Sequence, residues 1–191
     1  HLKVIDLGGG FKIPYHPAEK GTDLLAISKS LRDIIASHAE QTGQLLQVWF
    51  EPGKYLVCES GYLLTTVNVI KKNGPYSFAG VDTGLNHLIR PMLYDAYHEI
   101  ENCSNPTGPL KKYQVVGNIC ETDTLGADRD LPEVREGDIL VIKNAGAYGF
   151  EMASQYNARF RPAEVLYKEG QLQLIRRRET IEDLIRTQEN Y

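Results

Sequence analysis

One strand–helix–strand unit at the start of the chain constrains its fold more than any other feature. Val4-Ile5 precedes three consecutive glycines, which is typical of a buried strand that ends in a flexible loop. Apolar residues then recur at helical spacing from about Thr22 to Glu40, and a second run of strand length covers Leu45–Phe50. This order predicts two parallel strands joined by a helix, the repeating unit of an α/β sheet or barrel.

A single unit of this kind cannot cover both faces of its own strands. Residues 1–60 therefore need partner strands that the sequence does not supply. The opening residues His1-Leu2-Lys3-Val4 resemble neither an initiator segment nor a signal peptide. We expect the chain to be a fragment of a longer polypeptide or to pair with another one.

The pattern changes near Gly61, after which the apolar segments are short and separated by turn signals such as Asn73-Gly74-Pro75. A last helix is expected at Ile181–Gln188. The sequence thus predicts an α/β part over residues 1–60 and an antiparallel β domain over residues 61–191. The expected strands of that domain are Tyr62–Ile70, Ser77–Val81, Tyr113–Val116, Ile139–Ile142 and Leu172–Ile175.

The composition is that of a folded protein, with 42% apolar and 24% charged residues. A formal net charge of −4 gives no electrostatic reason to expect nucleic acid or an anionic membrane as a partner. No apolar run approaches the 18 residues or so of a membrane-spanning helix. The three cysteines form no CxxC pair, so we expect a reducing cytoplasm, no disulfide framework and no metal site.

Two loops that follow the first two strands contain residues suited to binding an anion. Gly8-Gly9-Gly10 lets backbone N–H groups approach a guest closely, and a phosphate is the usual one. Glu51 could hold a protonated ring nitrogen, and Lys54 could meet an anion. Each loop could equally be a plain turn with solvated charges.

Three later segments contain further candidates. Arg90 offers a two-pronged donor for a carboxylate, and Tyr94 lies close to it in the sequence. Cys120 is followed by Glu121 in a loop that begins at a glycine, and nearby carboxylates favour a protonated thiol over a thiolate nucleophile. Tyr148 stands between small residues. A surface arginine, a small core cysteine and a packed tyrosine are the alternatives.

The order of the segments is more specific than any one of them. Along the chain stand VIDLGGGF, FEPGK, GVDTGLNHLIRPMLYDAYHEI, GNICETD and NAGAYGFEMASQYNARFRPAEVL. Together they resemble the diaminopimelate decarboxylase family of fold-type III pyridoxal phosphate (PLP) decarboxylases, over essentially the whole chain. The resemblance implies the last part of a PLP-binding (β/α)₈ barrel followed by a C-terminal β domain. It places the lysine that holds the cofactor in a segment upstream of this chain.

The resemblance also implies which residues bind the cofactor. Gly8-Gly9-Gly10 matches the loop that binds the PLP phosphate, and Glu51 matches the carboxylate that faces the pyridine nitrogen. Gly53, Lys54 and Tyr148 also match cofactor-binding positions. Lys54 replaces the arginine that is usual in the family, so the charge is kept and the planar fork is lost.

The remaining matches concern the substrate. Lys54, Arg90, Tyr94, Glu121 and Tyr148 match substrate-binding positions, and Cys120 matches the acid that returns a proton to the α-carbon. The implied reaction converts meso-2,6-diaminopimelate to L-lysine and CO₂. Arg90 would pair with the carboxylate at the far end of the substrate, and Glu121 with the ammonium there.

The family forms its site at the interface of a homodimer, so Cys120 and Glu121 are expected to act on the partner subunit's cofactor. Two alternatives remain open from the sequence. One is a related decarboxylase of another basic amino acid, such as ornithine, lysine or arginine. The other is a homologue without catalytic activity that acts as a binding protein. In every case we expect the 191 residues alone to be inactive.

Overall fold

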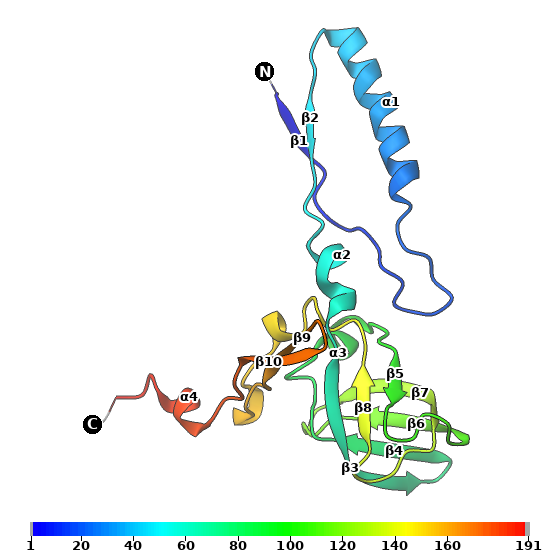
Figure 1. The fold of residues 1–191 in the computed structure, drawn as a ribbon, viewed down its shortest axis with the longest axis vertical. Helices are drawn as coiled ribbons and strands as arrows, with labels where there is room; N and C mark the ends of the chain where they lie inside the picture. Colours follow the sequence, from blue (N-terminus) through cyan, green and yellow to red (C-terminus); the bar gives the residue numbers. More distant parts are fainter. Residues whose placement is uncertain (1, 190–191) are drawn as a thin grey trace.

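The parallel pair expected at the start of the chain is present in the computed structural model, which describes residues 2–189. Strand β1 (Val4–Asp6) pairs with β2 (Gln47–Trp49), and the two strands end at the same edge. Helix α1 (Leu24–Thr42) connects them (Figure 1). Asp23 caps this helix because its Oδ1 accepts the Ala26 N–H at 2.9 Å. The predicted α/β unit is confirmed.

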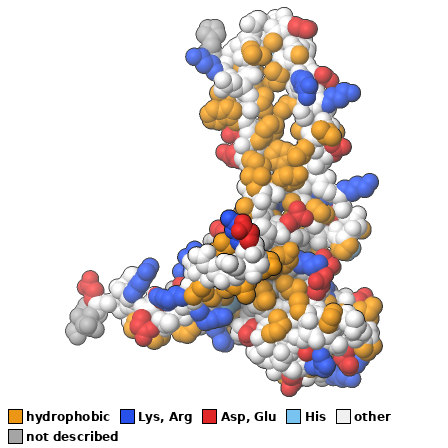
Figure 2. Space-filling model, viewed as in Figure 1, with side chains coloured by type: hydrophobic (Ala, Val, Ile, Leu, Met, Phe, Trp, Pro, Cys, Tyr) orange, Lys and Arg blue, Asp and Glu red, His pale blue; other side chains and the backbone are white. Residues whose placement is uncertain are grey.

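This first lobe leaves its apolar side chains uncovered. Helix α1 has no buried residue among its 19, and Leu25 and Ile34 are 85% and 63% exposed. Trp49 on β2 is 56% exposed. Figure 2 shows apolar side chains along the length of this lobe. The lobe therefore presents the unpaired, uncovered surface that the sequence predicts for an isolated strand–helix–strand unit.

A short helical connection leads from the first lobe to the second. Helix α2 (Gly53–Val57) follows β2 and continues into the 3₁₀ turn η1 (Cys58–Ser60), after which β3 begins (Figure 1). Gly61 lies against Gly146, because a Cβ on either glycine would overlap backbone atoms beside the other. This close approach fixes the point at which the chain enters the second lobe.

The second lobe is a six-stranded sheet in the order β5-β8-β3-β4-β6-β7. Four of the five neighbouring pairs are antiparallel, as expected. The fifth pair, β4 with β6, is parallel, because the chain between them makes a long crossover through α3 (Arg90–Tyr94) and β5. The strands are β3 (Leu63–Asn73), β4 (Tyr76–Val81), β5 (Ile100–Asn102), β6 (Leu110–Val116), β7 (Thr124–Pro132) and β8 (Ile139–Ile142).

One continuous apolar core stabilises this sheet. Its buried members come from all six strands and the loops between them, and each fully buried aliphatic side chain contributes roughly 1.5–3 kcal/mol. The residues of this core are Val67, Ala79, Val81, Leu88, Ile100, Tyr113, Val115, Leu125, Leu131, Val134, Leu140 and Ile142.

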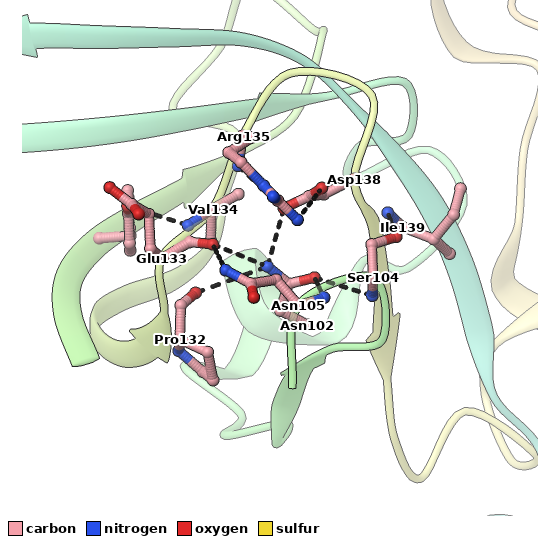
Figure 3. A network of polar contacts seen from close by, with 10 residues as sticks. Asn102, Ser104, Asn105, Pro132, Glu133, Val134, Arg135, Asp138 and Ile139 are labelled. Atoms are coloured by element: carbon pink, nitrogen blue, oxygen red, sulfur yellow. Dashed lines mark hydrogen bonds and ion pairs between the residues drawn. The ribbon is translucent and has the colours of Figure 1, made fainter. Parts of the chain in front are cut away.

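A polar network holds together one end of the sheet (Figure 3). The buried Asn102 side chain donates to Asp138 Oδ2 at 2.9 Å, and its Oδ1 accepts the Ser104 and Asn105 N–H groups at 3.0 and 3.2 Å. Arg135 donates to the same carboxylate. Burial opposes ionisation of Asp138, but the bonds from Asn102 and Arg135 outweigh it, so the pKa of Asp138 lies below its usual range. This network is structural.

The last part of the chain forms two 3₁₀ turns, a hairpin and a short helix that extends away from the sheet (Figure 1). These are η2 (Phe150–Met152), η3 (Tyr156–Ala158), β9 (Glu164–Lys168), β10 (Gln171–Arg176) and α4 (Ile181–Ile185). Every residue of β10 is exposed, including apolar Leu172 at 75%. The hairpin is therefore a second surface without a covering layer.

Candidate functional site

The glycine loop and Glu51 lie side by side because β1 and β2 are parallel and end together. The Glu51 N–H donates to the Gly8 carbonyl at 2.8 Å, and the Leu7 N–H donates to the Trp49 carbonyl at 3.0 Å. A Cβ on Gly9 would lie 2.5 Å from the Glu51 carbonyl oxygen, which is closer than real Cβ contacts. Glycine at this position is therefore what permits the loop and Glu51 to touch.

The glycine loop has the features of an anion site. Gly8 and Gly10 have φ values of 67° and 82°, which L side chains rarely adopt. The Gly8 N–H is bound to Asp6, but within residues 2–189 the N–H groups of Gly9 and Gly10 donate to no protein acceptor. Open space surrounds Gly8 and Gly10 where a Cβ would be. Two free amides in an open, glycine-lined loop fit a phosphate group.

A second group of predicted residues gathers around Tyr15, which follows the glycine loop in the sequence. The Arg90 guanidinium carbon lies 4.7 Å from the centre of the Tyr15 ring, and Lys54 Nζ lies 5.7 Å from it. The Tyr148 ring is 5.6 Å from the Arg90 guanidinium. Lys54, Arg90 and Tyr148 come from three separate segments, and the fold brings them together around Tyr15 and Arg90.

Arg90 is oriented by acceptors on one side only. Its Nη1 donates to the Tyr15 hydroxyl at 2.6 Å and faces His98 Nε2 at 3.4 Å. The buried Nε has no hydrogen-bond partner among the described residues, and no carboxylate within residues 2–189 forms an ion pair with Arg90. The positive charge of the guanidinium therefore has no partner of opposite charge among the described residues, and its Nη2 side can bind a ligand.

His98 supports this arrangement as a neutral ring. Its Nδ1 lies 2.8 Å from the Lys143 carbonyl, which can only accept, so Nδ1 carries the proton. Burial lowers the pKa of His98, and the nearby charges of Arg90 and Arg129 lower it further. The neutral ring then turns the Nε2 lone pair toward Arg90.

The loop that carries Cys120 and Glu121 is fixed by the buried Asp123. One carboxylate oxygen of Asp123 accepts the Leu85 N–H at 2.7 Å, and the other accepts the Ile119 N–H at 3.0 Å. Gly84 and Gly117 leave space for this carboxylate, because a Cβ on either would overlap it. Burial raises the pKa of Asp123, although the two amides oppose the shift.

Cys120 and Glu121 themselves face solvent. Cys120 Sγ lies 3.6 Å from a Glu121 carboxylate oxygen and 3.6 Å from the Asn157 side-chain nitrogen. The other Glu121 oxygen accepts the Tyr156 hydroxyl proton, and this bond lowers the pKa of Glu121. The same bond raises the pKa of Tyr156. The pair offers an exposed thiol beside a carboxylate that stays ionised.

The structure thus assembles the predicted residues in three groups: the glycine loop with Glu51, the cluster around Tyr15, and the Cys120 loop. Among the described residues no hydrogen bond, ion pair or cation–ring contact joins Cys120 or Glu121 to either of the other groups. Tyr94 ends helix α3 and is 60% exposed, and within residues 2–189 it forms no hydrogen bond or cation–ring contact with Arg90.

Sequence reasoning missed four residues that shape these groups: Tyr15, His98, Asp123 and Tyr156. Tyr15 could have been found from its position five residues after the glycine loop. His98 is fully buried, although histidine is more often found at the surface. Its ring is held by the tertiary contact with Lys143, which no local pattern reveals.

A cavity of about 860 Å³ adjoins these groups, because its lining includes His16, Pro91 and Thr122, the chain neighbours of Tyr15, Arg90 and Glu121. Tyr97, Arg129 and Thr122 are among its lining residues, and no residue predicted for the site lines it. The described residues contain no group of three or more His, Cys, Asp or Glu side chains that could hold a metal ion. Over the same part of the chain, no helix is both long and apolar enough to cross a membrane.

The fold and these three groups define a class of protein. Residues 4–146 match the family described as "Pyridoxal-dependent decarboxylase, C-terminal sheet domain", and the chain belongs to this family. The chain is also 46% identical over 190 residues to the diaminopimelate decarboxylase of Methanothermobacter thermautotrophicus, covering 98% of this chain and 44% of that protein. It is 42% identical to the diaminopimelate decarboxylase of Campylobacter jejuni, covering 100% of this chain and 46% of that protein.

Solved structures agree with these matches. The crystal structure of diaminopimelate decarboxylase from M. jannaschii superposes with a TM-score of 0.92 at 35% identity, over 99% of this chain and 43% of that one. Lysine decarboxylase from Selenomonas ruminantium gives a TM-score of 0.70 at 26% identity, over 84% of this chain and 41% of that one. The chain spans less than half the length of each of these relatives.

Proposed function

We propose that the complete polypeptide containing this chain decarboxylates meso-2,6-diaminopimelate to L-lysine and CO₂, with PLP as its cofactor. The names of the relatives at 38–46% identity support this substrate. The observation that carries the proposal is the Arg90 guanidinium, which lies within 6 Å of the Tyr15 and Tyr148 ring centres and has no carboxylate partner among the described residues. A substrate with a second carboxylate supplies the partner that this cation lacks.

The residues present fit PLP. The free Gly9 and Gly10 amides would hold the phosphate, with Gly53, Lys54 and Tyr148 near it, and the Glu51 carboxylate would face the pyridine nitrogen. When bound, the cofactor supplies an electron sink for the electron pair left by departing CO₂. Glu51 keeps the ring nitrogen protonated, which is the condition for that sink.

The substrate's far end would be held by residues of opposite charge. Arg90, aided by Lys54 and Tyr94, binds the distal carboxylate, and Glu121 binds the distal ammonium. The lowered pKa of Glu121 keeps it ionised for this task. Ornithine or lysine as a substrate has only the carboxylate that is lost, so either would leave Arg90 unpaired. Such a mismatch discriminates by roughly 10²-fold or more.

Cys120 would donate a proton from Sγ to the α-carbon after CO₂ has left. The thiol is exposed, and its Sγ lies 3.6 Å from a Glu121 carboxylate oxygen. Cys120→Ala in the complete enzyme is expected to cut turnover sharply while PLP absorbance is retained. Turnover equal to that of the wild type would remove Cys120 from this role.

The site would be shared between the subunits of a homodimer. Cys120 and Glu121 face solvent and, among the described residues, form no hydrogen bond with either of the other two groups, which supports their action on a partner subunit. A mixture of Cys120→Ala and Glu51→Ala polypeptides tests this, because a mixed dimer rebuilds one intact site. We expect activity to return to about a quarter of the wild-type value after the two are mixed; no recovery would contradict a shared site.

The first lobe would be the end of a (β/α)₈ barrel, and residues 61–191 a separate β domain. The uncovered apolar face of α1 supports this division, because it needs the remaining strands and helices of a barrel. Free cysteines at positions 58, 103 and 120 support a reducing cytoplasm as the location. The proposal predicts that the isolated 191 residues are inactive.

The direct test is CO₂ release by the purified complete polypeptide. We expect PLP absorbance and turnover of meso-diaminopimelate at least 100-fold faster, per unit concentration, than turnover of L-ornithine or L-lysine. Faster turnover of either monocarboxylate would favour the alternative substrates. A complete polypeptide that binds no PLP would favour the binding-protein alternative.

A further inference from the structure

We propose that Tyr15 is a positioning residue for substrate selection, which fixes the Arg90 guanidinium so that its free side meets the substrate's distal carboxylate. This inference rests on the function proposed above. It gives a role in substrate selection to Tyr15, which lies outside the segments that contain the predicted substrate-binding residues. Tyr15 lies in the irregular stretch between β1 and α1, whereas Arg90 opens α3 in the other lobe. Their contact therefore joins the lobe of the cofactor loop to the lobe of the substrate arginine.

The hydrogen bonds around Tyr15 run in one direction. Arg90 can only donate, so the Tyr15 oxygen accepts its Nη1 proton at 2.6 Å. The phenol proton is then directed to Cys58 Sγ at 3.1 Å, and the Cys58 thiol donates to the Asn144 carbonyl at 3.2 Å. Each group in this chain has its partner, so the Tyr15 hydroxyl is held in the orientation that receives Arg90.

Packing holds the rest of Tyr15 in place. Its ring lies against a small buried cluster of Ile13, Cys58 and Ala147, of which the first two are fully buried. Its backbone N–H donates to Glu19 at 3.1 Å. Burial is the main cause that raises the pKa of the Tyr15 phenol, and its hydrogen bond to Cys58 raises this pKa further. The charge of Arg90 opposes the shift. The phenol therefore stays neutral and does not cancel the charge of Arg90.

The same ring serves two cations. Arg90 lies 4.7 Å and Lys54 Nζ 5.7 Å from its centre, both within range of attraction by the ring quadrupole. This attraction offsets part of the repulsion between two positive charges that both need an anion. Since the Tyr15 hydroxyl takes up Nη1, the unpaired Nη2 is the edge that remains for a carboxylate.

The test uses Tyr15→Phe in the complete, PLP-loaded enzyme, because this change removes only the hydroxyl. We expect KM for meso-diaminopimelate to rise about tenfold, as for loss of one hydrogen bond to a charged group, with kcat changed less than about twofold. Inhibition by L-lysine, which keeps the distal carboxylate and ammonium, should weaken by a similar factor. Inhibition by 1,5-diaminopentane, which has no carboxylate, should stay within about twofold.

Two further variants separate positioning from general stability. Tyr97→Phe is the matched control: Tyr97 is also half-buried and stacks on a cation, Arg129, but its hydroxyl bonds to nothing within residues 2–189. It should behave as the wild type. In an Arg90→Leu background, Tyr15→Phe should add less than about twofold to the loss, because the role of Tyr15 passes through Arg90.

The outcomes are distinguishable from failure of the proposed function. A wild-type enzyme that releases no CO₂ from diaminopimelate ends the proposed function. A wild-type enzyme that does so, with Tyr15→Phe kinetics unchanged, overturns the positioning role alone. The positioning role is also overturned if Tyr15→Phe weakens inhibition by L-lysine and by 1,5-diaminopentane equally. The same holds if the effects of Tyr15→Phe and Arg90→Leu on KM are fully additive, since either result shows an effect that does not depend on the carboxylate.

Discussion

Asp123 gives the sharpest stability prediction, because it anchors the Cys120 loop with two bonds to buried backbone. Replacing it by alanine leaves the Leu85 and Ile119 N–H groups without their acceptor. Each unsatisfied buried donor costs about 1–3 kcal/mol, which gives roughly 2–6 kcal/mol for the pair. Burial raises the pKa of Asp123, which shows that desolvation of its carboxylate offsets part of the stabilisation by the two hydrogen bonds. We therefore expect Asp123→Ala to lower the free energy of unfolding by about 3 kcal/mol.

For a complete polypeptide with the length of the relatives, more than twice that of this chain, about 3 kcal/mol corresponds to a fall of roughly 3–4 °C in Tm. The assay is thermal unfolding of the complete polypeptide, followed by near-ultraviolet circular dichroism. Asp123→Asn keeps one carbonyl acceptor and no charge, so it should cost about half as much. Asp130→Ala, an exposed acid on strand β7, which follows Asp123, should shift Tm by less than about 1 °C.

Turnover should follow the loop. Asp123→Ala is expected to lower kcat by tenfold or more at temperatures where the protein is folded, because the loop that carries Cys120 loses its anchor. An Asp123→Ala protein with unchanged Tm would refute the magnitude worked above. One with lowered Tm and unchanged kcat would show that the loop keeps its geometry without Asp123.

Three further predictions follow from the same contacts. Gly9→Ala should lower PLP occupancy, measured by absorbance, because its Cβ would displace the Glu51 backbone from the loop; full occupancy would contradict the anion site. Arg90→Leu should lower kcat/KM for diaminopimelate by roughly 10²-fold or more, and far more than for L-ornithine; equal losses would favour the alternative substrates. Tyr156→Phe removes the hydrogen bond that lowers the pKa of Glu121, so the pKa of this carboxyl should rise. On acidification, the variant should therefore lose substrate binding at a higher pH than the wild type does. An acid limb at the same pH in the profile of KM against pH would argue against that bond.

The elements with a strong local pattern could be predicted from the sequence. The helix expected from about Thr22 to Glu40 spans Leu24–Thr42, and the strand expected at Ile139–Ile142 has those bounds. Strand β7 was missed because Asp128, Arg129 and Asp130 interrupt its apolar pattern. These residues face solvent or a neighbouring ring, and the pairing with β6 fixes the strand regardless of propensity.

The last helix shows the opposite error. It was expected to reach Gln188 and ends at Ile185. None of its residues is fully buried, and Ile181 and Ile185 are 53% and 44% exposed. Pattern and capping establish where such a helix begins, but its length depends on packing. The parallel pairing of β4 with β6 was missed for a related reason, since it depends on a crossover rather than on the strands themselves.

The candidate site divides in the same way. The glycine loop and Glu51 could be placed together from sequence, because parallel strands end at one edge. The meeting of Lys54, Arg90 and Tyr148 at Tyr15 could not, since it requires contacts between the two lobes. The roles of Asp123 and Tyr156 could not be predicted either, because each acts through a partner at least 35 residues away or through a buried turn.

The central claim is that these separate loops meet around one anionic ring cofactor, and a crystal structure of the complete protein with PLP and L-lysine tests it most directly. The account predicts the phosphate on the Gly9 and Gly10 amides, Glu51 at the pyridine nitrogen and the lysine carboxylate on Arg90. It also predicts that Cys120 reaches this site from the second subunit. PLP bound away from the glycine loop, or a lysine carboxylate that ignores Arg90, would contradict it.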